Sequence, residues 1–151
     1  MQYPSEEEVN RLRHNARCVV RELGLLNDAY FNIGVTLAER HLLIELSVIE
    51  SPTMGEIGER LILEKSTVSR LIAKAVKKGY IDCIQDKKDK RRKTLKLTKY
   101  GEETLRAFEP IAFSQTNEAL LTLSKEEIET VFRGVSLYAQ GLKNARTKTS
   151  K

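Results

Sequence analysis

Apolar residues recur every three or four positions through most of this 151-residue chain, which is the spacing of an amphipathic α-helix. The first such stretch runs from Glu6 to about Phe31, and Ser5 with Glu8 forms a capping-box pattern at its start. A helix this long and this regularly striped is typical of one that packs on another long helix, in a second subunit or within the same subunit. The stripe comprises Val9, Leu12, Ala16, Val19, Leu23, Leu26 and Tyr30.

Two further helices follow, each with its own start signal. Gly34 interrupts the first pattern, and Thr36 is the expected cap of a second helix from Leu37 to about Glu50. Thr53 with Glu56 is a capping box for a short helix that ends at Leu61. In the second helix we expect Leu42, Leu43, Leu46 and Ile49 to face inward and Glu39, Arg40 and Glu45 to face outward.

A helix with two contrasting faces is predicted from Glu64 to Lys78. Its apolar stripe comprises Val68, Leu71, Ile72, Ala75 and Val76. The opposite face carries hydroxyls and cations with no acid after Glu64: Lys65, Ser66, Thr67, Ser69, Arg70, Lys74 and Lys77. These groups suit phosphates and base edges. A short helix, a tight turn and then a polar-faced helix form the helix-turn-helix plan, and the small Gly58 would let the two helices cross closely.

After Gly79 the hydrophobic period changes to that of strands. Residues 80–85 and 94–98 read as the two strands of a hairpin. Between them, residues 86–93 hold six basic and two acidic side chains. A basic run is usually a solvated loop. Its position between two strands, directly after a helix-turn-helix, instead favours the DNA-contacting wing of a winged helix.

The carboxyl-terminal third is again helical. Thr98 is the expected cap of a long helix with Leu105, Phe108, Ile111 and Ala112 inward, in which Pro110 should introduce a bend. Ser124 and Glu127 form a capping box for a last helix, and a polar tail follows. The stripe of the last helix comprises Ile128, Val131, Phe132, Val135, Tyr138 and Leu142.

These elements predict a mainly α protein with a small β-wing. Its winged helix-turn-helix core is flanked by N- and C-terminal dimerisation helices. The expected division is residues 1–34 for the N-terminal dimerisation helix, 35–98 for the DNA-binding domain, 99–145 for the C-terminal dimerisation helices and 146–151 for a flexible tail. Because the terminal helices have apolar stripes with no obvious partner in the small central domain, we expect a homodimer.

The charge distribution supports a polyanionic partner. The chain has a net charge of +5, but residues 64–93 alone hold eleven basic and four acidic residues. The remainder holds 15 basic against 17 acidic residues, so one surface carries the excess positive charge. No apolar run approaches the ~20 residues of a membrane span, and the acidic start is unlike a secretion signal. We therefore expect a cytoplasmic protein with no membrane partner.

The motifs resemble those of the MarR (multiple antibiotic resistance regulator) family over roughly residues 5–145. The resemblance rests on the order of elements and on the core of the basic helix, Ser66 to Arg70. It also rests on Lys78-Gly79 at the end of that helix and on the wing pattern Asp86-x-x-Asp89-x-Arg91. Leu97-Thr98-x-x-Gly101 completes the match.

The resemblance implies a winged-helix transcription regulator that binds a pseudo-palindromic operator in double-stranded DNA as a homodimer. A repressor is the interpretation that we favour, and the sequence leaves an activator open. It implies DNA contacts from Lys65, Ser66, Thr67, Ser69, Arg70 and Lys74, and from Lys88, Asp89 and Arg91 of the wing. In that wing, Arg91 would enter the minor groove and Asp89 would orient it. Members often respond to a small phenolic or anionic effector, whose site the sequence leaves unknown.

Two departures from the family pattern stand out. Ile62 occupies a turn position where the family often has glycine, so we expect slightly different turn geometry. Cys18 lies in the region where redox-sensing relatives carry a reactive cysteine, but without the tyrosine-containing surroundings of that subgroup. A redox-sensing regulator using Cys18 stays an alternative within the family, and a buried, inert Cys18 is the interpretation we favour. Cys83 on a wing strand is expected to be a packing residue.

Other classes of function have less support. The two histidines, His14 and His41, have no ligands at metal-site spacing, and no phosphate loop or nucleophile elbow is present. We therefore expect no enzyme activity, no metal and no cofactor. A winged-helix module for protein interaction or RNA binding is the alternative. RNA binders more often expose aromatic residues for stacking, however, and residues 64–93 contain only Tyr80.

Overall fold

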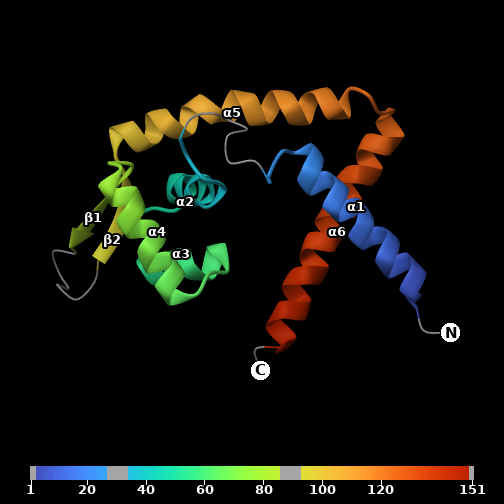
Figure 1. The fold of residues 1–151 in the computed structure, drawn as a ribbon, viewed down its shortest axis with the longest axis horizontal. Coiled ribbons are helices and arrows are strands. Elements are labelled where there is room, and N and C mark those ends of the chain that lie inside the picture. The colour runs from blue at the N-terminus through green and yellow to red at the C-terminus, as the bar shows by residue number, and fades with distance from the viewer. Residues whose placement is uncertain (1–2, 27–33, 86–92, 150–151) are drawn as a thin grey trace. The chain divides into compact units, whose positions relative to one another are not determined.

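The computed structural model describes residues 3–26, 34–85 and 93–149, which form six α-helices and one two-stranded sheet (Figure 1). This confirms the expected fold class, a mainly α chain with a small β-hairpin inside a winged helix-turn-helix. The elements in chain order are α1 (Glu6–Glu22), α2 (Leu37–Val48), α3 (Met54–Leu61), α4 (Lys65–Lys77), β1 (Ile81–Gln85), β2 (Lys93–Leu97), α5 (Lys99–Leu120) and α6 (Lys125–Thr149).

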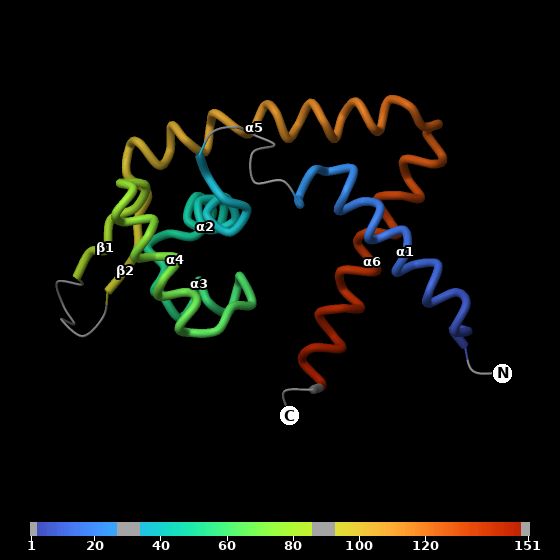
Figure 2. Tube along the Cα trace, viewed as in Figure 1, coloured from blue at the N-terminus to red at the C-terminus, as the bar shows by residue number. Residues whose placement is uncertain are grey.

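The chain divides into two compact units, Met1–Ile111 and Ala112–Lys151. In the first unit, α3, α4 and β2 all contact α2. Figure 2 traces the course of these elements. The buried core draws on each of these elements and on the first half of α5. Its members are Val35, Leu42, Leu43, Leu46, Ile57, Val68, Leu71, Ile72, Ala75, Tyr80, Ile81, Leu95 and Phe108.

Three helices of this unit end with the same hydrogen-bond pattern. After α1, the Gly24 amide donates to Arg21 O (2.9 Å) and the Leu25 amide donates to Val20 O (3.1 Å). Gly24 has a φ of 66°, so it takes the left-handed conformation that closes a Schellman motif. The prediction that the first helix continues to Phe31 is therefore wrong. Gly24 ends the helix, and residues 27–33 lie outside the described part of the chain.

The other two endings frame the helix-turn-helix. After α4, the Gly79 amide donates to Val76 O (2.9 Å) and the Tyr80 amide to Ala75 O (3.0 Å), with Gly79 at a φ of 76°. After α3, the Leu63 amide donates to Gly58 O (3.0 Å). Here the left-handed position is filled by Ile62, at a φ of 56°. An isoleucine thus adopts the left-handed conformation that glycine favours, and the expected difference from the turn of other family members stays a prediction.

The hairpin is antiparallel, with Ile81 opposite Leu97 and Gln85 opposite Lys93. The Leu95 amide donates to Pro52 O (2.8 Å), and Thr94 forms an isolated bridge with Thr53. The sequence did not indicate these contacts, which join β2 to the segment between α2 and α3. They fix the base of the wing against the start of α3.

The Thr98 side chain joins the hairpin to α5. Its hydroxyl accepts from the Gly101 amide (3.0 Å) and lies 2.6 Å from Gly79 O and 3.1 Å from Tyr80 O, to which it can donate. This confirms the predicted cap. It also explains the glycine of the Leu97-Thr98-x-x-Gly101 pattern, because a Cβ on Gly101 would lie 2.0 Å from Tyr80 O.

The second unit contains the rest of α5 and all of α6. The α5 helix is continuous through Pro110. The predicted capping box of α6 is present, with Ser124 N donating to Glu127 Oε2 (2.8 Å) and Glu127 N to Ser124 Oγ (3.3 Å). The helix then continues to Thr149, through most of the residues predicted as a flexible tail, because these residues include good helix formers and no proline or glycine.

Candidate nucleic-acid interface

The α4 helix has the two faces that its sequence predicts. Val68, Leu71, Ile72 and Ala75 are buried, which anchors one face in the core. Val76, assigned to the same stripe, is 41% exposed and lies at its edge. On the other face Lys65, Ser66, Ser69 and Arg70 are exposed, and Thr67 is half-buried with its hydroxyl 3.5 Å from Arg70 Nη2.

The amino end of α4 is open to an anion. Among the described residues, no side chain caps this end at Glu64, and the first turn contains no acid. The aligned amides leave a partial positive charge at a helix start, and a phosphate is the natural ligand of such a position. Lys65 and Ser66 stand beside it, so the beginning of α4 combines backbone donors, a hydroxyl and a cation.

The crossing of α3 over α4 depends on Gly58. This residue is buried, and a Cβ there would lie 3.2 Å from Val68 Cγ2 and 3.6 Å from Leu63 O. The prediction that a small residue allows a close crossing is thus confirmed. The close contact fixes the direction in which α4 presents its outer face.

The wing is described only at its base. Residues 86–92, which include Lys88, Asp89 and Arg91, lie outside the described part of the chain. The strands that bracket them are present at the expected place after α4. The roles expected for these three residues therefore stay predictions.

Residues 33–92, which span the helix-turn-helix and the wing, match the model of the MarR family. The matched segment is the central part of the chain, 60 of its 151 residues. The resemblance that its motifs indicated is confirmed.

Solved structures share the fold over nearly the whole chain. Streptomyces coelicolor AbsC, a MarR family transcriptional regulator, gives a TM-score of 0.75 at 21% identity and covers 95% of this chain and 99% of its own. Streptococcus pneumoniae FabT, solved in complex with DNA, gives 0.72 at 22% identity, with 95% and 99% covered. The S. aureus MepR–DNA complex gives 0.75 at 24% identity, with 85% and 96% covered. At these identities the likeness establishes the fold. No protein with a curated description matches the chain in sequence.

Within the segment that matches the family model, Glu39 is a buried carboxylate that the sequence interpretation placed outside. It is completely buried, so the prediction that it faces outward is wrong. It lies three and four residues before Leu42 and Leu43, which puts it on their face. Together with Thr36 it also forms a capping box, a signal that was present in the sequence.

Both oxygens of Glu39 have partners. Oε2 accepts from the Thr36 amide (2.8 Å) and from Lys78 Nζ (2.9 Å). Oε1 lies 2.9 Å from Lys78 Nζ and 3.3 Å from Lys74 Nζ. Burial raises the pKa of Glu39, but the Thr36 amide and the two ammonium groups outweigh it, so the pKa lies below its ordinary value. Lys74, expected to contact DNA, therefore already holds an ion pair.

Cys18 of α1 is half-buried, so its side chain is more exposed than the buried cysteine that the sequence favoured. Its sulfur lies 3.5 Å from His14 Nε2 and 3.2 Å from Arg21 Nη2. These neighbours share one face of α1, because they stand four residues before and three after it. Cys83, expected to be a packing residue, is exposed on β1.

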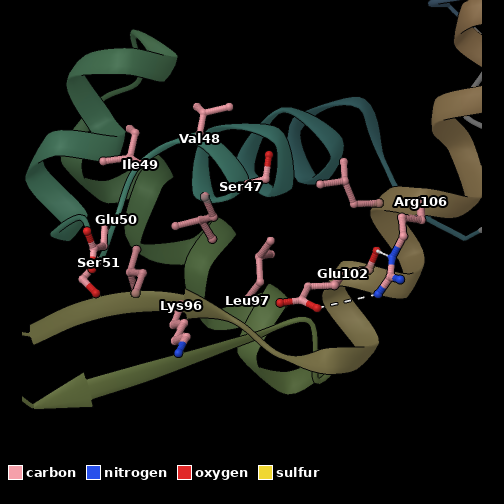
Figure 3. A pocket seen from close by; sticks show the side chains of 12 residues that line it. Ser47, Val48, Ile49, Glu50, Ser51, Lys96, Leu97, Glu102 and Arg106 are labelled. Atoms are coloured by element: carbon pink, nitrogen blue, oxygen red, sulfur yellow. Dashed lines mark hydrogen bonds and ion pairs between the residues drawn. The ribbon is translucent and has the colours of Figure 1, made fainter.

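A groove of about 750 Å³ opens beside the carboxyl end of α2 (Figure 3). Leu46, Leu95, Leu97 and Leu105 contribute apolar surface, and Arg106 with Glu102 forms an ion pair (3.7 Å) at its edge. Its volume lies in the range of small-molecule sites, roughly 300–1,000 Å³. The rest of the lining comes from Ser47, Val48, Ile49, Glu50, Ser51 and Lys96.

The described residues were also searched for metal-binding groups and for membrane-spanning helices. In that part of the chain, no group of three or more His, Cys, Asp or Glu is arranged to hold a metal ion. None of the helices within residues 3–26, 34–85 and 93–149 combines the length and apolarity needed to span a membrane.

Proposed function

We propose that the protein is a sequence-specific transcription regulator that binds double-stranded DNA as a homodimer. The observation that carries this proposal is the outer face of α4, which exposes hydroxyls and cations while its inner face is held in the core. The structures of FabT and MepR with DNA, which share this fold, support it. In this reading α4 is the recognition helix and enters the major groove.

The first two turns of α4 are the proposed base-reading segment. Arg70 is exposed and long enough to reach a base edge, and Ser66, Thr67 and Ser69 offer short hydroxyls. Lys65 and the open amino end of the helix would hold phosphate. In the wing, Arg91 would enter the minor groove with Asp89 orienting it and Lys88 beside it.

The direct test is an anisotropy titration with labelled duplex DNA drawn from a selected operator pool. We expect a preference for one pseudo-palindrome over random duplex, single strands and RNA. A preference for RNA would instead favour the RNA-binding alternative, and a protein that binds none of these nucleic acids would favour the protein-interaction alternative. Arg70→Ala should weaken operator binding by roughly 1–3 kcal/mol and relax specificity if Arg70 reads a base. Lys125→Ala, which removes an exposed cation from α6, is the matched control.

The homodimer is proposed from the apolar surface of the terminal helices. No residue of α1 is buried, although Val9, Leu12 and Val19 keep the predicted stripe. On α6, Phe132 is 52% exposed and Val135 is 65% exposed. Burying such residues against a second copy stabilises each large side chain by about 1.5–3 kcal/mol. Two recognition helices would then face successive major grooves, about 34 Å apart.

A charge placed on the α6 stripe tests the dimer. Val135→Asp should shift the mass measured by light scattering from dimer toward monomer, because a carboxylate would be buried in the contact. Gln140→Asp places the same charge on the opposite side of α6 and should leave the mass unchanged. A monomeric wild-type protein, or equal behaviour of the two variants, would contradict the proposed interface.

We also propose that the protein represses transcription and that a small phenolic or anionic effector releases it. A reporter gene placed behind the selected operator should be expressed less when the protein is present. The groove of Figure 3 is the proposed effector site, because it joins an apolar floor to the Arg106 guanidinium. Aromatic carboxylates and phenols should then lower operator affinity. Arg106→Ala should abolish the response to carboxylates without changing effector-free affinity, and a wild-type response would exclude this groove.

A further inference from the structure

We infer that Glu39 is a positioning residue of the DNA interface, which clamps the carboxyl-terminal cations of α4 and keeps Lys74 away from phosphate. This inference rests on the proposed function. Its starting observation is an asymmetry in exposure: the carboxylate is fully buried, whereas the Lys74 side chain is 52% exposed and that of Lys78 is 30% exposed. The cations therefore come to the carboxylate from the surface.

The clamp has three attachments. The Thr36 amide fixes Glu39 at the start of α2, and Lys78 Nζ reaches both carboxylate oxygens. Lys78 also donates to Gly34 O (3.0 Å), so the end of α4 is bound to backbone that precedes α2. Lys74 adds the third attachment, one helical turn earlier on α4. Together these contacts hold the last turn of α4 against the amino end of α2.

The energetics make the clamp persistent. A buried carboxylate that loses its cations is left uncompensated, which is far less favourable than an exposed pair that opens to water. A phosphate contact from Lys74 would have to draw the ammonium away from Glu39. Since surface contacts with phosphate are made in high dielectric and are screened by salt, the buried partner should retain the cation.

The consequence is that the recognition helix has a segment that contacts DNA, its first two turns, and a segment after it that does not. Lys74 lies four residues after Arg70 on the same side of α4, where an uncompensated cation would add a sequence-independent phosphate contact. With Glu39 holding it, contact with DNA is confined to the first two turns, where Arg70 and the hydroxyls lie. Glu39 thus favours specificity over total affinity while never touching DNA.

The test compares the salt dependence of duplex binding in four variants of the full chain. Glu39→Gln removes the charge but keeps an acceptor for the Thr36 amide, because glutamine also completes a capping box. Glu45→Gln is the matched control: Glu45 is also on α2, and its ion pair is with Arg60 of α3. Lys74→Gln and the double variant Glu39→Gln with Lys74→Gln complete the set. The readouts are the slope of log K against log salt and the ratio of operator to random-duplex affinity.

We expect Lys74→Gln and Glu45→Gln to keep the wild-type slope. Glu39→Gln should steepen it by about 0.9, because the released Lys74 meets a phosphate while Lys78 is still held by Gly34 O, and it should lower the specificity ratio. The double variant should return the slope to the wild-type value, which a purely structural effect of losing Glu39 would not do.

Two results would overturn the inference while leaving the proposed function standing. One is a wild-type protein that prefers its operator but loses slope in Lys74→Gln, which would place Lys74 on phosphate. The other is a Glu39→Gln protein with the slope and specificity ratio of Glu45→Gln. If Glu39→Gln fails to fold by circular dichroism, Lys74→Gln alone decides. A wild-type protein with no preference for duplex DNA would remove the proposed function itself.

Discussion

Replacing Gly101 by alanine should destabilise the domain more than any other single-methyl addition on α3 or α5. An alanine Cβ would lie 2.0 Å from Tyr80 O, 3.0 Å from Tyr80 C and 3.3 Å from Leu97 Cδ2. Ordinary contacts between heavy atoms lie at about 3.5–4.0 Å, so the first turn of α5 would have to move by more than about 1 Å. Two of the three neighbouring atoms are backbone, which cannot turn aside as a side chain would.

The magnitude follows from what that movement disturbs. Overpacking a close contact costs about 1–3 kcal/mol. The Tyr80 carbonyl that would be struck also accepts from the Thr98 amide (3.0 Å), and the Tyr80 ring stacks on Tyr100 with centroids 5.4 Å apart. Weakening one or two hydrogen bonds adds about 0.5–1.5 kcal/mol each. A total of about 3–4 kcal/mol is a large part of the roughly 5–15 kcal/mol that stabilises a typical domain.

The assay is thermal unfolding followed by circular dichroism, with urea unfolding as a second measure. At about 2–4 °C per kcal/mol for a chain of this size, Gly101→Ala should lower the Tm by about 6–16 °C. Gly55→Ala is the control, because it adds the same methyl to α3, where the nearest atom is Thr53 Oγ1 at 3.9 Å. It should be neutral or stabilising. Equal Tm values for the two variants would refute the close contact between α5 and Tyr80.

Three other predictions concern the first unit of the chain. Ile62→Gly should raise the free energy of unfolding by up to about 1 kcal/mol, measured by urea unfolding. The left-handed conformation costs a β-branched residue about 1–2 kcal/mol, which glycine avoids, whereas the greater freedom of glycine in the unfolded chain costs about 0.5–1 kcal/mol. Thr98→Val should lower stability by about 1–3 kcal/mol, because it leaves the Gly101 amide without its acceptor. Acid should remove the contribution of Glu39: its folded pKa lies below the ordinary 4.5, so its stabilisation is present above that pH and is lost as pH falls through the folded value. Urea midpoints at pH values on both sides of 4.5 should therefore change less in Glu39→Gln than in wild type.

The fold could be predicted from the sequence where local signals and hydrophobic period agree. Capping patterns at Ser5, Thr53 and Ser124 mark helix starts that the structure contains, and the buried residues of α4 follow the 3.6-residue period. The two strands were indicated by the change of period after Gly79. Each of these signals depends on neighbours within a few positions along the chain.

The wrong predictions, the end of α1 and the exposure of Glu39, each concern a residue whose type is compatible with two different structures. Apolar spacing continues past Gly24 to Leu26 and Tyr30 and predicts one long helix, whereas the left-handed conformation of Gly24 ends that helix. Glu39 was assigned to solvent because it is charged, although its spacing from Leu42 placed it on the buried face. Only its distant partners on α4, about 40 positions away in the chain, make its burial possible, and no local pattern reveals such a pair.

The candidate DNA interface depends on residues that need not touch DNA. Gly58 sets how closely α3 crosses α4, Gly79 closes the far end of α4, and Glu39 holds that end against α2. Each acts on a different part of the same helix, so changes at these positions should alter the presentation of Arg70 without removing any group from the outer face. Because specificity depends on side-chain placement within a fraction of an ångström, sequence variation at such supports would retune the operator as effectively as changes on the contact face.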